Sequence, residues 1–128
     1  MILVDAGVLI DFLRTKDAKL AQLFRSQPLA LCGVTRAEIL AGARSSPVRT
    51  KLMRFLGTFH QVAIPDPCWD LVGDNLATLA ARGITIPFPD AVVATVGIEN
   101  DMEVWARDAH FPSMQRVLTR LRLFQEPP

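Results

Sequence analysis

A three-residue apolar run, Ile2–Val4, ends in a carboxylate at Asp5, and a second apolar pattern with helix spacing begins at Val8. A run this short predicts a buried strand, and the pattern that follows it predicts a helix. A strand that leads directly into a helix is typical of open α/β sheets, whose ligands bind outside the carboxyl ends of the strands. Asp5 would stand at such an end, where a carboxylate serves either as a helix cap or as a cation ligand.

The same alternation continues along the chain. We expect strands at residues 2–4, 29–32, 60–64, 103–106 and 121–124, and helices at 8–14, 18–26, 35–43, 46–59, 66–82, 90–98 and 113–119. Residues 91–98 are apolar nearly all round, and Asp90 after Pro89 favours a buried helix over a strand there. The alternation predicts a three-layer α/β/α sandwich with a mainly parallel central sheet. A chain of this length predicts a single domain, residues 1–128.

Composition narrows the class of protein. Half of the residues are hydrophobic and the mean hydropathy is +0.25, enough for a real core and consistent with a buried partner surface. Arg82 and Asp90 interrupt the longest apolar region, so we expect no membrane span. Met1 leads straight into a strand pattern without a basic leader, so we expect no signal peptide. Cys32 and Cys68 lack the spacing of a disulfide framework, which favours a reduced, cytoplasmic protein.

Charge is distributed unevenly although the net charge is only +1. Residues 1–60 contain nine Lys and Arg against four Asp and Glu, and residues 61–128 contain five against nine. The basic side chains of the first half either cover solvated helix faces or form a rim that meets phosphates. The sequence leaves both interpretations open.

Four acids occupy special places in the predicted elements. Asp5 and Asp108 each follow a strand, and Asp90 opens an apolar helix. Glu38 lies three residues after Thr35, in a pattern that predicts a capping box at the first turn of a helix. Taken singly, Glu38 and Asp90 are explained equally well as caps. Asp5 and Asp108 have no obvious structural task.

Together the four acids predict a cation site. Parallel strands would bring Asp5 and Asp108 to one edge of the sheet, and the helix starts that carry Glu38 and Asp90 can face the same edge. Carboxylates that converge repel one another unless a cation neutralises them. Oxygen ligands of this kind suit hard divalent cations such as Mg²⁺ or Mn²⁺.

The order of these acids resembles the PIN-domain ribonucleases, and most closely the VapC toxins of bacterial toxin–antitoxin pairs. Four segments carry the resemblance: Met1–Leu13 (MILVDAGVLIDFL), Val34–Gly42 (VTRAEILAG), Pro87–Thr95 (PFPDAVVAT) and Val104–Phe111 (VWARDAHF). Each motif is weak by itself. Four in order, in a chain of family-like length, form a strong match that spans nearly the whole sequence.

The resemblance implies a metal-dependent endoribonuclease with a PIN-like fold. Asp5, Asp90 and Asp108 would hold one or two Mg²⁺ ions, with Mn²⁺ as a substitute, and Glu38 would join them or orient the attacking water. Phosphates of a single-stranded or looped RNA would be contacted by basic side chains. The candidates for that contact are Arg36, Arg44 and Arg107.

The resemblance also implies partners. A VapB-like antitoxin would inhibit the nuclease by filling its cleft, and the toxin would form a homodimer. No membrane partner is expected.

Two departures from the family pattern keep an alternative open. Ala6 and Gly7 stand where a hydroxyl pair usually follows the first acid, and Ala106 stands where Thr or Ser usually precedes the fourth. Such hydroxyls orient a metal-binding carboxylate or a bound water. The alternative is therefore a catalytically inactive nucleic-acid-binding or interaction module on the same fold. A different Mg²⁺ enzyme or a phospho-acceptor domain is a third candidate, although the DxD pattern of phosphohydrolases is absent after Asp5.

Three further features are expected to be structural. His110 lies near Asp108, where a surface or packing role is favoured over a substrate contact. Trp69 and Trp105 are expected in the core rather than stacked on a base. The Leu and Phe face of residues 52–59 predicts core packing, with a groove for a partner helix as the alternative.

Overall fold

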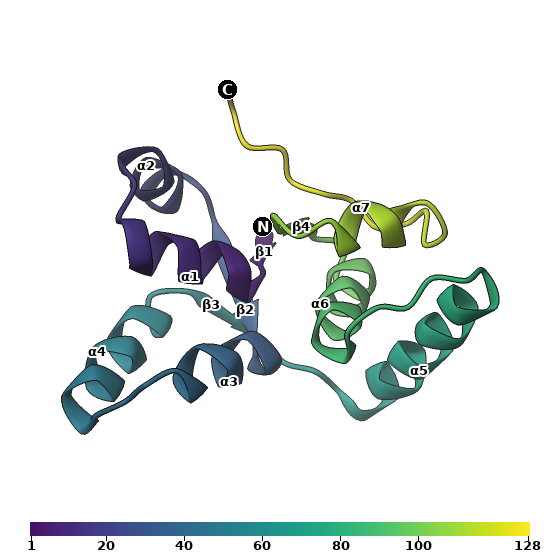
Figure 1. Ribbon diagram of the computed structural model, residues 1–128, viewed down its shortest axis with the longest axis horizontal. Coiled ribbons are helices and arrows are strands. Elements are labelled where there is room, and N and C mark those ends of the chain that lie inside the picture. The colour runs from purple at the N-terminus through teal and green to yellow at the C-terminus, as the bar shows by residue number, and fades with distance from the viewer.

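The computed structural model describes residues 1–128 and contains seven helices and four strands (Figure 1). In chain order the elements are β1 (Ile2–Val4), α1 (Ala6–Thr15), α2 (Ala18–Ser26), β2 (Leu29–Cys32), α3 (Gly33–Ala41), α4 (Ser46–Leu56), β3 (His60–Val62), α5 (Asp66–Ala81), α6 (Phe88–Glu99), β4 (Glu103–Trp105) and α7 (His110–Gln115). Strands therefore alternate with helices or helix pairs, as the apolar pattern predicts.

The four strands form one parallel sheet in the order β3-β2-β1-β4. β1 lies between two neighbours, and Ile2 is paired with Leu29 of β2 and with Glu103 of β4. Because the strands run in the same direction, their carboxyl ends meet at one edge of the sheet. The residues that follow β1 and β4 consequently leave the sheet side by side.

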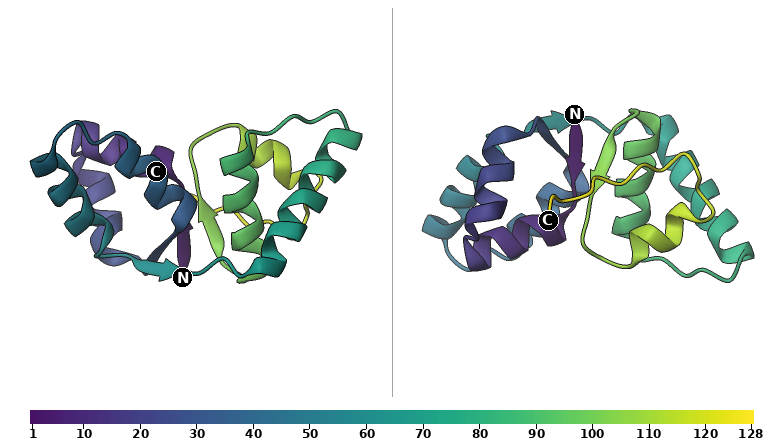
Figure 2. Two further views of the ribbon diagram at one scale, coloured as in Figure 1. Left: turned by 90° about the horizontal axis from the view of Figure 1, so that it is seen from below. Right: turned by 90° about the horizontal axis from the view of Figure 1, so that it is seen from above.

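Helices cover both faces of the sheet. Successive residues of a strand point to opposite faces, so the side chains of β1 are divided between the two faces of the sheet. Leu3 belongs to a core formed with α5, α6 and α7, whereas Ile2 and Val4 belong to a second core formed with α1 to α4. Figure 2 shows the two groups of helices on either side of the strands. The predicted three-layer α/β/α sandwich is confirmed, and the sheet is entirely parallel.

The last predicted strand is much shorter than expected. Residues 121–124 form a single parallel bridge, between Leu123 and Val104. The Val104 N–H donates to the Arg122 carbonyl at 2.8 Å, and the Phe124 N–H donates to the Val104 carbonyl at 2.9 Å. The segment thus pairs with β4, but only one residue of β4 takes part, so no ladder extends from it.

Several helix starts differ from the predicted ones, among them those of α1, α6 and α7, whereas α4 and α5 begin at residues 46 and 66 as predicted. Ser45 caps α4 by accepting a hydrogen bond from the Val48 N–H at 3.3 Å. Pro65 precedes α5, and Asp66 makes no capping bond. Helix α7 begins at His110, before the predicted start at residue 113. A proline within the first turn is compatible with a helix because the N–H that it lacks has no intrahelical partner there, so Pro112 did not mark the boundary.

Helix α6 is buried as predicted, and every residue from Ala91 to Gly97 is shielded from solvent. It packs closely on β4, because a Cβ at Gly97 would collide with the Val104 side chain. Helix α5 ends where expected, before Gly83, whose φ of 77° lies in the left-handed region that favours glycine. None of the helices combines the length and the apolar character needed to cross a membrane.

Candidate metal centre

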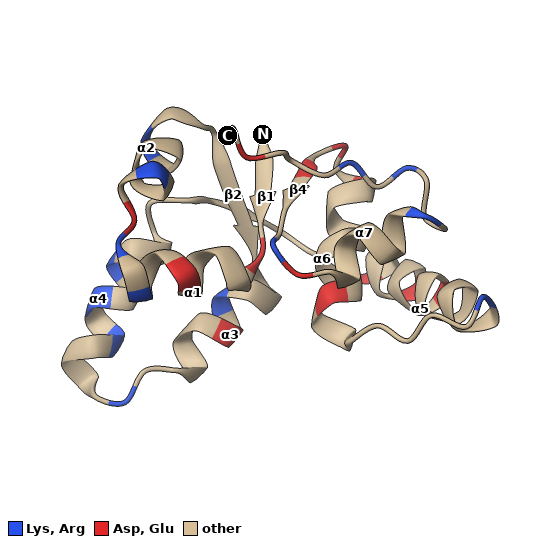
Figure 3. Cartoon of the chain, turned by 45° about the horizontal axis from the view of Figure 1, so that its top comes forward, with Lys and Arg blue, Asp and Glu red and all other residues tan.

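The carboxyl edge of the sheet gathers the four predicted acids. Asp5 directly follows β1, and its N–H donates to the Trp105 carbonyl at the end of β4, at 2.9 Å. This bond ties the start of α1 to the loop that carries Asp108. In Figure 3 the acidic segments after β1 and β4, on α3 and at the start of α6 lie around the same edge. The convergence expected from parallel strands is therefore present.

Asp5 is the most perturbed of these carboxyls. It is buried, with 7 % of its surface exposed, and its Oδ2 accepts a hydrogen bond from the Gly7 N–H at 3.3 Å. Burial raises the pKa of Asp5 from 3.8 to about 6, and the nearby charges of Asp90 and Glu38 act in the same direction against the Gly7 bond. Asp5 also caps α1, so the helix cap that the sequence left open as one of its two roles is present.

Asp90 lies in the first turn of α6 but does not cap it, because the N-cap is Pro87. Partial burial and the charge of Asp108 raise the pKa of Asp90, while a hydrogen bond from His110 lowers it. The pKa of Glu38 is also raised, by partial desolvation and by Asp90. Beyond the larger effect of burial, the charges of these carboxyls raise one another's pKa values, which indicates that the carboxyls lie close together.

The capping box predicted at Thr35 does not form. Helix α3 begins at Gly33 with Cys32 as N-cap, two residues earlier than expected, so Glu38 lies in the second turn and projects from an exposed position. The Thr35 hydroxyl is fully buried and has no hydrogen-bond partner. The prediction was wrong because continuous pairing of β2 into Cys32 allows the helix to start at once.

His110 belongs to the cluster, which the sequence interpretation missed. Its Nδ1 lies 2.8 Å from Asp90 Oδ2 and 2.8 Å from Asp108 Oδ1. The His110 N–H also donates to Asp108 Oδ1 at 2.8 Å, closing a turn over the start of α7. The spacing of Asp108 and His110, with one residue between them, is the signal that could have indicated this contact.

The donor set fits a hard divalent cation. One ligand atom each from Asp90, Asp108 and His110 lies within 4.8 Å of the other two. Asp5 is not part of this tight group, but its carboxylate is close enough to Asp90 for the charge of Asp90 to raise its pKa. Carboxylate oxygens are the ligands that Mg²⁺ and Mn²⁺ prefer, and a bound cation would offset both the burial and the smaller mutual repulsion that raise the pKa values of Asp5, Glu38 and Asp90.

The three predicted phosphate-binding arginines differ in their surroundings. Arg107 is held by Glu126 and Asp11. Arg36 donates to Gln61 Oε1 at 3.4 Å and approaches Met53 Sδ at 3.3 Å. Arg44, in the loop between α3 and α4, has an exposed side chain and no ion pair. Arg44 is therefore the freest of the three.

The aromatic side chains divide between core and surface. Trp105 is fully buried, as expected, and Phe55 and Phe59 pack with Phe24 in the core between α1, α2 and α4. The prediction for Trp69 was wrong: 40 % of its surface is exposed. The core-facing stripe of α5 runs through Cys68, Val72 and Leu79, and Trp69 beside it lines an open cavity instead.

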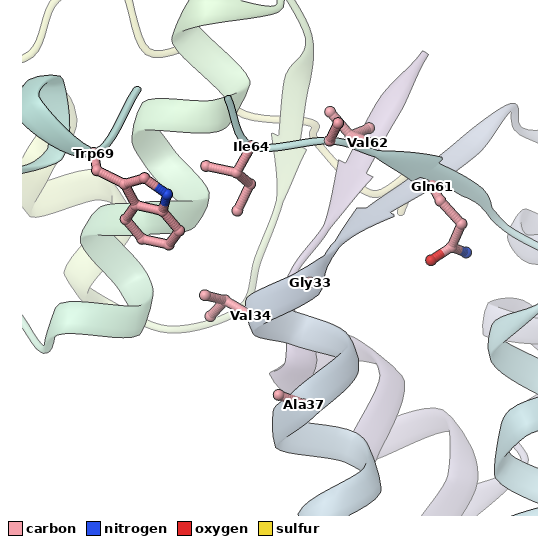
Figure 4. A pocket seen from close by; sticks show the side chains of 8 residues that line it. Gly33, Val34, Ala37, Gln61, Val62, Ile64 and Trp69 are labelled. Carbon is pink, nitrogen blue, oxygen red and sulfur yellow. The ribbon is translucent and has the colours of Figure 1, made fainter. Parts of the chain in front are cut away.

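An open cavity of about 550 Å³ lies beside Trp69, between the ends of β2 and β3 and the start of α3 (Figure 4). Its lining is mainly apolar and includes Val34, Ala37 and Ile64. The Trp69 ring also lies parallel to that of Phe88, with centroids 6.5 Å apart, and 55 % of Phe88 is exposed. An apolar surface therefore continues from the sheet edge onto α5 and α6.

Several solved structures have folds similar to that of this chain. A chain of VapBC2 from Rickettsia felis, bound to a DNA fragment from their promoter, matches 97% of this chain and 98% of its own length, with 16% identity and a TM-score of 0.82. The chain has the PIN-like α/β/α fold. A chain of FitAcB from Neisseria gonorrhoeae shows the same PIN-like arrangement, with 18% identity over 98% of both chains and a TM-score of 0.78.

A third similar structure is VapC20 from Mycobacterium tuberculosis, a sarcin-ricin loop cleaving toxin. It shares 16% identity over 85% of this chain and 91% of its own, with a TM-score of 0.67. No family model and no curated protein sequence matches the chain. At these identities the similarity establishes the PIN-like fold, which the resemblance of the four acidic motifs predicts.

Proposed function

We propose that the protein is a metal-dependent endoribonuclease that acts as the toxin of a toxin–antitoxin pair. The observation that carries the proposal is the convergence of Asp5, Glu38, Asp90 and Asp108 at the carboxyl edge of a PIN-like sheet, where three of the four carboxyls have raised pKa values. Such crowding is costly in a structural cluster and useful in a cation site. The similar solved chains include a toxin named for cleaving the sarcin-ricin loop.

Asp5, Asp90 and Asp108 are the residues proposed to hold Mg²⁺, with Mn²⁺ as a substitute. When bound, the cation makes water a better nucleophile at neutral pH and stabilises negative charge on the phosphoryl group. Asp5 contributes a carboxylate that the α1 cap fixes in place. Asp90 and Asp108 are oriented by their shared contact with His110.

Glu38 and the basic residues are proposed to act on the substrate. Glu38 projects from an exposed position on α3 and would orient the attacking water or join the ligands. Arg44 and Arg36 lie on the half of the chain with excess positive charge, where phosphates on either side of the scissile bond would bind. A single-stranded or looped RNA has the backbone freedom to enter this edge. Arg107 would need to leave its acidic partners before it could contact a phosphate.

The proposed partners are a VapB-like antitoxin and a second copy of the chain, with the complex in the cytoplasm. VapBC and FitAB assemblies are among the similar structures. Exposed apolar side chains supply surface for such contacts, among them Trp69 and Phe88 beside the 550 Å³ cavity. A homodimer that buries these rings would also account for the apolar composition.

The decisive experiment is cleavage of total cellular RNA by the purified protein in Mg²⁺, in Mn²⁺ and in EDTA. We expect cleavage that requires a divalent cation and that Asp90→Asn abolishes. The matched control is Asp70→Asn, which makes the same chemical change on an exposed face of α5. Cleavage that persists in EDTA, or that both variants reduce equally, would contradict the proposal.

The second candidate function is an inactive PIN-like module that binds nucleic acid or a partner protein. The observation that favours it is the absence of a side-chain hydroxyl at Ala6 and Ala106, on either side of the cluster. A folded, antitoxin-free protein that binds Mn²⁺ and RNA but cuts no RNA would support this candidate. In that case Ala106→Thr is the substitution to test for a gain of cleavage.

A further inference from the structure

Glu126 joins two residues of the strand end that carries Asp108. Its Oε2 accepts a hydrogen bond from the Trp105 Nε1–H at 2.9 Å and from the Arg107 Nε–H at 2.8 Å. Its Oε1 accepts from Arg107 Nη2 at 2.8 Å. The Glu126 carboxylate therefore forms a two-point pair with the guanidinium, the geometry in which arginine and carboxylate interact most strongly. It also satisfies the only polar atom of a buried tryptophan side chain.

Asp11 holds the remaining side of the same guanidinium. Arg107 Nη1 lies 3.1 Å from Asp11 Oδ2 on α1. The two carboxylates raise the pKa of Arg107, and Arg107 lowers the pKa of Glu126. All three side chains are about one-third exposed, so solvent weakens the attraction and the arrangement competes with other partners for the arginine.

The acids of the metal centre are rival partners for Arg107, because one of them is its neighbour in the chain. Arg107 immediately precedes Asp108 in the loop between β4 and α7. The same loop is tied to Asp5, because the Asp5 N–H donates to the Trp105 carbonyl. An arginine that entered the cluster would neutralise the carboxylates and occupy the place of a cation. Arg107, next to Asp108, could thus compete with a metal ion for the carboxylates of the cluster.

We propose that Glu126, together with Asp11, is a positioning residue that holds Arg107 against α1 and thereby keeps Asp5, Asp90 and Asp108 available to a divalent cation. The inference rests on the proposed function, since it concerns the same metal centre. It assigns a task to a residue far from the four acidic motifs in the sequence. It also predicts that the strength of metal binding depends on the charge of Glu126.

The test measures Mn²⁺ binding to the metal-free protein by titration calorimetry, with electron paramagnetic resonance as a second readout. Glu126→Gln keeps an acceptor for the Trp105 N–H but removes the charge that holds Arg107. We expect the Mn²⁺ dissociation constant to rise about twofold to fivefold, the range for one ion pair at a partly exposed site. Adding Arg107→Gln to this variant removes the competitor and should restore the original affinity.

Two controls separate positioning from simple loss of structure. Asp11→Asn does not touch Trp105, and we expect a smaller rise of the dissociation constant in the same direction. Thermal unfolding of each metal-free variant shows whether it remains folded. The inference would be overturned, but not the proposed function, if Glu126→Gln left the Mn²⁺ affinity unchanged. The same holds if Glu126→Gln lowered the affinity and adding Arg107→Gln did not restore it. Failure of the unchanged protein to bind Mn²⁺ would overturn the proposed function and this inference with it.

Discussion

His110 Nδ1 lies 2.8 Å from Asp90 Oδ2, a contact that joins the start of α6 to the start of α7. The two residues are 20 positions apart, and the same nitrogen lies 2.8 Å from Asp108 Oδ1. The imidazole thus connects two of the proposed metal ligands. Histidine in such a position fixes the orientation of carboxylates before a cation arrives.

Replacing His110 is expected to weaken metal binding. His110→Ala leaves Asp90 without its side-chain donor, so we expect the Mn²⁺ affinity to fall by about tenfold, the lower end of the range for residues that orient metal ligands. Titration calorimetry measures this directly. His60→Ala is the matched control because His60 is exposed on β3. Equal affinities in the two variants would show that the imidazole does not orient the ligands.

The stability of the metal-free protein is expected to depend on pH through Asp5. Its pKa is raised from 3.8 to about 6, so between these values the folded state binds more protons than the unfolded state. The free energy of unfolding should therefore fall as the pH rises from about 4 to about 6. One pKa unit corresponds to about 1.4 kcal/mol, so the loss is at most about 3 kcal/mol.

Asp5→Asn tests the origin of this pH dependence. Asparagine retains the helix cap but cannot ionise, so urea unfolding in EDTA should show a much flatter pH profile for the variant. The same slope in both proteins would place the effect elsewhere. Saturating Mg²⁺ should flatten the profile of the unchanged protein too, because the cation stabilises the ionised carboxylates and the folded state that binds it.

Two glycines are expected to respond oppositely to the same substitution. Gly97→Ala places a methyl group against Val104 and so separates α6 from β4. We expect a loss of about 1–3 kcal/mol, the usual cost of overpacking. Gly73→Ala has open space around the new methyl group in α5, and we expect a gain of about 0.5–1 kcal/mol. Chemical denaturation measures both, and losses of equal size would contradict the close α6–β4 contact.

Two buried threonines are also expected to respond differently to the same substitution, here by valine. The Thr35 hydroxyl has no partner, so Thr35→Val should leave the stability unchanged or raise it by up to about 1 kcal/mol. The Thr95 hydroxyl donates to the Ala91 carbonyl at 2.7 Å and accepts from Asn75 Nδ2 at 2.9 Å. Thr95→Val should cost about 1–3 kcal/mol. A comparable loss at Thr35 in urea unfolding would indicate a bound water on its hydroxyl.

Much of the architecture could be predicted from local patterns. The short apolar run Ile2–Val4 predicts a buried strand, and for residues 91–98, where the apolar pattern fits a strand or a buried helix, Asp90 after Pro89 favours the helix. Strand and helix alternation then permits few arrangements other than a parallel sheet covered on both faces. Asp5, Asp90 and Asp108 were identifiable because each stands where a strand or helix begins or ends, whereas Glu38 was identified at a predicted helix start and lies in the second turn of α3.

Helix boundaries and side-chain partners were harder to predict from the sequence. Thr35 and Glu38 match a capping box, yet the helix begins before Thr35 because β2 runs directly into it. Trp69 has an apolar ring that favours the core, but the register of α5 turns it outward. Local propensity differs little between such neighbouring registers, so packing decides among them.

The sequence by itself determined the order of elements, the parallel α/β class and the set of acids at the carboxyl edge, because hydrophobic periodicity is a local property and the alternation of strands with helices favours parallel strands. Only the tertiary structure decided that His110 lies between Asp90 and Asp108 and that Glu126 and Asp11 enclose Arg107. These contacts join residues on different elements, and the distances between them depend on how α1, α6 and α7 pack around the sheet. The spacing of residues along the chain does not reveal that packing.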